Sequence, residues 1–126
     1  MEYAYLYMRG ETIMNIPGVD IDTGLMNVGD DEEIYVIVLE TYVEEAIENV
    51  EKLLEYRDQD IKNFTIYAHA LKSANNNIGA LELGEKARLL EMAGKDEDTA
   101  YINANVDSFC DEIRKLVDDI SANLEG

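Results

Sequence analysis

The apolar residues of this chain recur at intervals of three and four along most of its length, which is the spacing of one face of an α-helix. The longest such stripe comprises Ile102, Val106, Phe109, Ile113, Leu116, Ile120 and Leu124. The chain has a single proline, Pro17, and proline is the residue that breaks helix interiors. We therefore expect an all-α fold.

Helix-capping signals divide the pattern into four helices. The first begins at Asp30, which with Glu33 has the spacing of a capping box, and ends near Tyr56. The second is capped by Asp60 and runs to Gly79, a residue type favoured just after a helix C-terminus. Each helix carries one apolar stripe, so each is expected to bury one face.

The third helix lies between Gly79 and Gly94, and the fourth carries the long stripe described above. Short connections force successive helices to lie side by side, so we expect an antiparallel up-down four-helix bundle. Residues 16–27 are expected to form a short helix or turn that caps one end. The domain organisation is then an N-terminal arm, residues 1–15, and one bundle, residues 16–126.

Composition excludes several classes of protein. A chain of 126 residues is the size of one domain, and its formal net charge of -18 disfavours nucleic acid and bare membrane as partners. The single cysteine, Cys110, excludes an intramolecular disulfide and is compatible with a reducing compartment. No membrane span or targeting segment is recognisable, so we expect a cytoplasmic protein and, by default, a monomer.

The lone histidine, His69, is predicted to face water. At 100° per residue, it lies about 150° from the centre of the apolar sector formed by the second helix. The residues that share its face are Lys62, Thr65, Lys72, Ser73 and Asn76, none of which is acidic. From Ile61 to Leu81 there is no Asp or Glu, although an even spread of the 28 acids would place between four and five there. We infer an acid-free window around His69.

An exposed imidazole with a lysine one turn later suits nucleophilic attack on phosphorus. An imidazole in water is largely neutral at pH 7, so a ring nitrogen keeps its lone pair without a general base. Lys72 can offset the charge of a phosphoryl group carried on His69. Small residues such as Ser73 and Gly79 would let another protein come close.

The stretch Ala68-His69-Ala70-Leu71-Lys72-Ser73, followed by Asn77-Ile78-Gly79-Ala80, resembles the signature of histidine-phosphotransfer domains, the carriers of phosphorelays. That signature is His, any two residues, Lys, then Gly or Ser, with a further Gly ten residues after the His. The resemblance extends over about residues 16–122. Ser73 stands where glycine is often found, a change that the family tolerates.

The resemblance implies that His69 accepts a phosphoryl group from the aspartyl phosphate of a receiver domain and passes it to another receiver's aspartate. Such a carrier is a phosphotransfer intermediate rather than an enzyme. It needs no cofactor or metal of its own, because the receiver supplies the magnesium. The implied partners are receiver domains and a hybrid or other histidine kinase. The docking residues we expect are Lys62, Thr65, Ile66, Ser73, Asn76 and Gly79.

Three alternatives remain open. The phosphoacceptor module of a chemotaxis-type histidine kinase resembles these domains but takes its phosphoryl group from a kinase's ATP. An interaction-only bundle would tolerate replacement of His69. A hydrolase is disfavoured, because the acid-free window offers no second catalytic group beside His69.

Overall fold

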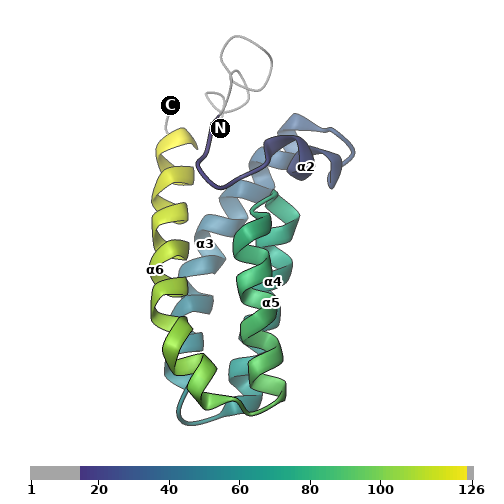
Figure 1. Ribbon diagram of the computed structural model, residues 1–126. Coiled ribbons are helices and arrows are strands. Elements are labelled where there is room, and N and C mark those ends of the chain that lie inside the picture. The colour runs from purple at the N-terminus through teal and green to yellow at the C-terminus, as the bar shows by residue number, and fades with distance from the viewer. Residues whose placement is uncertain (1–14, 125–126) are drawn as a thin grey trace.

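The computed structural model describes residues 15–124, so the expected arm of residues 1–15 lies outside the described part except for Asn15. Four long helices pack as a bundle and a short helix lies across one end (Figure 1). The helices are α2 (Ile21–Met26), α3 (Glu32–Tyr56), α4 (Ile61–Ile78), α5 (Leu81–Lys95) and α6 (Thr99–Leu124). No strand occurs within residues 15–124, which confirms the predicted all-α fold.

The four long helices follow one another around the bundle. Helix α3 packs against α4 and α6, and α5 packs against the same two helices from the other side. The connections are residues 57–60, 79–80 and 96–98, too short to carry the chain back along the bundle. Successive helices therefore run antiparallel, as Figure 1 shows and as the short predicted connections indicated.

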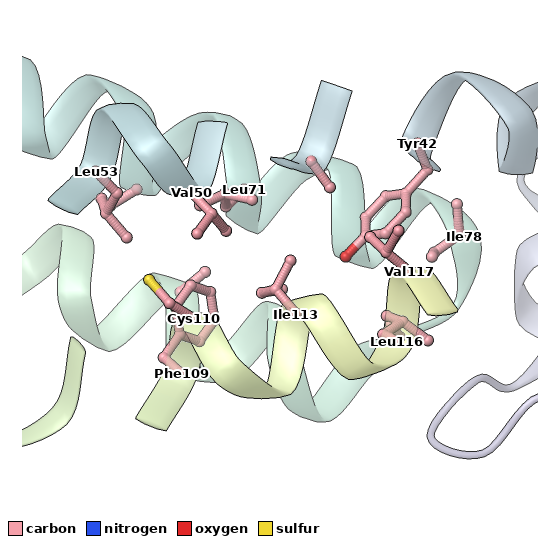
Figure 2. Packing of buried hydrophobic residues seen from close by; sticks show 14 of the residues in the cluster. Tyr42, Val50, Leu53, Leu71, Ile78, Phe109, Cys110, Ile113, Leu116 and Val117 are labelled. Carbon is pink, nitrogen blue, oxygen red and sulfur yellow. The ribbon is translucent and has the colours of Figure 1, made fainter. Parts of the chain in front are cut away.

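The apolar stripes meet in one core. Cys110 and Ile113 of α6 lie opposite Val50 and Leu53 of α3 and Leu71 of α4 (Figure 2), and all five are fully buried. Burial raises the pKa of the Cys110 thiol to about 11. Cys110 is therefore a protonated packing residue.

A buried hydrogen bond between two polar side chains joins α3 to α4. The Tyr42 hydroxyl donates to Asn75 Oδ1 at 2.9 Å, and Asn75 Nδ2 donates to the Leu71 carbonyl oxygen at 2.7 Å. Asn75 is fully buried, where an unpaired amide would be costly. The pair sets the register of α4 against α3 about two turns after His69.

Two helix boundaries differ from prediction. The N-cap of α3 is Asp31, whose side chain accepts from the Ile34 amide, while Asp30 adopts a left-handed conformation with φ 61°. Helix α5 continues through Gly94 to Lys95. A Cβ at Gly94 would collide with the Thr65 hydroxyl of α4, so this glycine serves the packing of α5 against α4 and does not end the helix.

Helix α2 covers the end of the bundle where α4 stops. Gly79 has φ 93°, and its carbonyl accepts from the Asp20 amide at 2.9 Å. The Tyr35 hydroxyl donates to the Ile78 carbonyl oxygen at 2.7 Å, and Asn27 Nδ2 donates to the carbonyls of residues 76 and 77. The last carbonyls of α4 are thus satisfied by the α2 segment and by Tyr35 of α3, which together cover Gly79 and the end of α4.

Candidate functional site

His69 lies midway along α4 with 59% of its side chain exposed. Its helix neighbours Ala68 and Leu71 are fully buried on the opposite face. The outward orientation predicted from helix periodicity is therefore confirmed. An exposed imidazole without a partner can rotate, so the contacts of the His69 ring determine its orientation and which nitrogen carries the proton.

A carboxylate from the next helix holds the ring. Glu91 of α5 places Oε2 2.8 Å from His69 Nδ1 and Oε1 2.8 Å from Lys72 Nζ. The Nζ atom of Lys95, one turn further along α5, lies 3.4 Å from Oε2. The Glu91 side chain is only 6% exposed, so a nearly buried carboxylate links one histidine and two lysines.

Glu91 is an anion at neutral pH. Burial acts to raise the pKa of its carboxyl, but hydrogen bonds from Lys72 and His69 outweigh that effect and hold the pKa at about 2. An ionised carboxylate only accepts hydrogen bonds, so Nδ1 of His69 must carry a proton. In the neutral ring, the lone pair is then on Nε2, the nitrogen that Glu91 does not contact.

The acid-free window therefore holds for helix α4 but not for the surroundings of His69, which include an acid from α5. Helix α4 contains no acid, as predicted, yet α5 supplies one directly to His69. Sequence reasoning missed Glu91. A signal existed, because Gly84, Ala87 and Glu91 follow one another at three and four residues on α5 and all are buried. An acid on a buried stripe indicates a partner nearby.

Glycines on α5 bring the two helices close enough for this contact. A Cβ added to Gly84 would collide with the Asn76 side chain, and one added to Gly94 would collide with the Thr65 hydroxyl. Both glycines are buried between α4 and α5. Glu91 lies between them in the sequence of α5, where the two helices are close enough for its carboxylate to reach His69.

The predicted docking residues separate into two groups. Lys62, Ile66 and Asn76 are exposed on α4, and Thr65 and Ser73 are half-buried. Gly79 is buried, and a Cβ there would collide with the Asp20 carbonyl oxygen. The expectation that Gly79 eases the approach of a partner stays a prediction, and the structure gives this glycine a local role: it is required by the left-handed helix end and by the segment that covers it.

Lys72 is also less free than expected. Its side chain is 26% exposed, and its ammonium forms an ion pair with Glu91. The ion pair restricts the position of the Lys72 ammonium. Within residues 15–124, no group of histidine, cysteine or acidic side chains has the arrangement of a metal site. In the same range, no helix is both long and apolar enough to cross a membrane.

Comparisons with protein-family models, with curated proteins and with solved structures gave no match for this chain. Its function is therefore inferred from the chemistry of His69, Glu91 and Lys72.

Proposed function

We propose that this protein is a histidine-phosphotransfer carrier. Nε2 of His69 receives a phosphoryl group from the aspartyl phosphate of one receiver domain and passes it to the aspartate of another receiver. The observation that carries the proposal is the 2.8 Å contact between His69 Nδ1 and Glu91. That contact holds the ring by one nitrogen and leaves the other as an exposed nucleophile.

The bond changes balance without a proton acceptor. The Nε2–P bond forms as the P–O bond of the aspartyl phosphate breaks, and the bonding electrons leave with the aspartate carboxylate. Nδ1 keeps its proton, so the phosphorylated ring carries a positive charge. Glu91, 2.8 Å away and ionised, is placed to balance that charge.

Lys72 supplies the second electrostatic element. Its ammonium and the His69 imidazole bind the two oxygens of the same Glu91 carboxylate, which holds Lys72 on the same side of α4 as the ring. A cation at this position offsets the charge of the phosphoryl group during transfer. The chain needs no metal for these roles, and the magnesium of the reaction belongs to the receiver partner.

The Glu91 contact removes one argument against a hydrolase, because a second functional group does stand beside His69. The exposure of the site favours transfer over hydrolysis nevertheless. Small-molecule substrates are usually bound in concave sites that cover most of their surface, whereas 59% of the His69 side chain is open to solvent. A second protein that brings its own pocket fits this geometry better.

The test is phosphorylation of the intact protein, followed by mass spectrometry. Wild type and His69→Gln are incubated with phosphoramidate and, separately, with a panel of phosphorylated receiver domains. The proposal expects a single phosphoryl adduct that is acid-labile, alkali-stable and absent from His69→Gln. A folded wild-type protein that gains no adduct from any of these donors contradicts it.

Adding a chemotaxis-type histidine kinase with ATP as a further donor separates the related alternatives. Labelling by receivers supports the carrier, whereas labelling only by a chemotaxis-type histidine kinase with ATP supports its phosphoacceptor module. An interaction-only bundle binds receivers equally well as wild type and as His69→Gln and gains no adduct.

A further inference from the structure

The first half of α3 is apolar on all sides. Residues 34–39, Ile-Tyr-Val-Ile-Val-Leu, are six consecutive apolar residues in a chain of which 30% is charged. Three of them are buried in the core, but Ile37 is 51% exposed and Ile34 is 46% exposed. A helix that is hydrophobic all round is normally buried all round. The outer face of this half of α3 thus presents apolar surface that the described part of the chain leaves open to solvent.

Ile34, Ile37 and Thr41 form one patch on this outer face, called here the α3 patch. They follow one another at three and four residues, which is the spacing of a single helix face. Thr41 is exposed, but its hydroxyl donates to the Ile37 carbonyl oxygen at 3.0 Å, so its polar group is already paired. The same stripe continues along α3 as Glu44 and Glu48, both exposed. The apolar surface is therefore confined to the first half of the helix.

Acidic side chains border the α3 patch where the helix begins. Asp30, Asp31, Glu32 and Glu33 are consecutive in the sequence and line a hollow of about 400 Å³ directly before Ile34. The patch is thus apolar surface next to concentrated negative charge. An occupant that complements both features carries apolar side chains beside a cation.

The N-terminal arm of this chain has that composition. Residues 3–8, Tyr-Ala-Tyr-Leu-Tyr-Met, are uncharged and contain three of the eight tyrosines of the chain. Aromatic side chains bury large apolar areas when they pack. Arg9, the only base among residues 1–14, follows this run directly. An apolar run next to a cation matches an apolar patch next to acids.

The arm is attached at the end of the bundle where the α3 patch lies. The described chain begins at Asn15, and Ile16 is buried at the end that carries α2, where α3 also begins (Figure 1). A chain of 14 residues can span up to about 45 Å, whereas residues 34–41 occupy about 10 Å along the helix. A tethered segment also meets its site at an effective concentration on the order of millimolar. Neither reach nor concentration therefore limits the contact.

A second copy of the chain is a poorer occupant of the α3 patch. Each copy carries a formal charge of -18, so two copies repel one another. A symmetric contact would also present the same surface from both sides. The patch and its bordering acids contain no base, so such a contact brings negative charge together without a cation.

We infer that residues 3–8 pack on the α3 patch and that Arg9 pairs with the acids at the start of α3. The N-terminal arm is then part of the folded domain and not a separate extension of the bundle. This inference concerns α3 and does not rest on the function proposed for His69 on α4.

The first test is paramagnetic relaxation measured by methyl NMR on the whole chain. A nitroxide is attached to Glu2→Cys, next to the proposed contact, while Cys110 stays unlabelled because it is fully buried and protonated. The nitroxide should broaden the δ1 methyl signals of Ile34 and Ile37 much more than that of Ile66, which is 60% exposed on α4. Equal broadening of the three signals, or no broadening of Ile34 and Ile37, overturns the inference.

The same label shows whether a second copy supplies the arm. Nitroxide-labelled protein without isotopes is mixed with isotope-labelled wild type, so that any broadening must act between molecules. The inference expects the signals of Ile34 and Ile37 to stay sharp in this mixture. Broadening there as strong as in the singly labelled, isotope-enriched protein overturns it.

The second test measures the energetic coupling between the arm and the α3 patch by urea unfolding. Leu6→Ser should lower the urea midpoint of wild type and of the control variant Ile66→Ser, because it removes an apolar side chain from the contact. In the Ile37→Ser background the patch is already disrupted, so Leu6→Ser should change the midpoint only about a third as much or less. An equal effect in the two isoleucine variants, or no effect of Leu6→Ser on wild type, overturns the inference.

Discussion

Glu91 Oε2 lies 2.8 Å from Nδ1 of His69, although the two residues are 22 positions apart and belong to different helices. The contact fixes both the ring of a solvent-exposed histidine and the position of its proton, which leaves Nε2 as the nitrogen facing away from Glu91. The same carboxylate also holds Lys72 through its other oxygen at 2.8 Å. One acidic residue thus organises the whole site.

Glu91→Gln should slow phosphorylation of His69 by phosphoramidate about tenfold or more. The amide no longer balances the positive charge of the phosphorylated ring, and it fixes the ring tautomer less strongly. The rate is measured by intact mass against time, and its pH profile should change as well. Glu85→Gln is the matched control, since Glu85 lies on the same helix, is exposed and pairs only with Arg88. Equal rates for the two variants would show that Glu91 is merely structural.

The stability of the protein should depend on Glu91 between about pH 4.5 and pH 2. The pKa of Glu91 in the folded protein, about 2, is below the 4.5 of a free glutamate side chain, so the carboxylate stabilises the fold above pH 4.5. This contribution is lost as the pH falls through that window. Urea unfolding of wild type and Glu91→Gln should therefore differ most near neutral pH and converge near pH 2. A constant difference across the range would contradict this assignment.

Lys72 and Lys95 should contribute unequally to transfer. Lys72 is 26% exposed and 2.8 Å from Glu91, whereas Lys95 is 64% exposed and 3.4 Å away. We expect Lys72→Ala to slow phosphoramidate labelling about tenfold and Lys95→Ala to slow it less than threefold, since a fixed cation is worth more than a mobile one. Circular dichroism checks that both variants fold. A larger effect for Lys95→Ala would reverse the roles given to the two lysines.

Gly79→Ala should destabilise the bundle more than Gly29→Ala does. Both glycines have positive φ, 93° and 68°, so both substitutions carry a backbone cost of about 1 kcal/mol. At Gly79 the new Cβ also meets the Asp20 carbonyl oxygen, while at Gly29 nothing lies within 4 Å. Thermal unfolding measures the difference, and equal melting temperatures would mean that the contact between the α2 segment and the end of α4 contributes little.

The sequence by itself determined the helices and the direction in which His69 points. Helical periodicity is a local property, so the apolar stripes of α4 and α6 predict which faces are buried, and Asp60 and Gly79 mark the ends of α4. The sequence pattern predicts the N-cap of α3 one residue early, because Asp30 and Asp31 have the same capping chemistry and only the backbone conformation distinguishes them.

Only the tertiary structure decided what surrounds His69. Which residue of α5 meets the imidazole depends on the rotation and approach of two helices, and these are set by the packing of Gly84 and Gly94 against α4. No spacing within α4 reports on that approach, so an acid-free helix could still receive Glu91 from its neighbour. The same reason explains Gly79, whose burial follows from where the α2 segment packs, a non-local contact that the pattern along α4 does not contain.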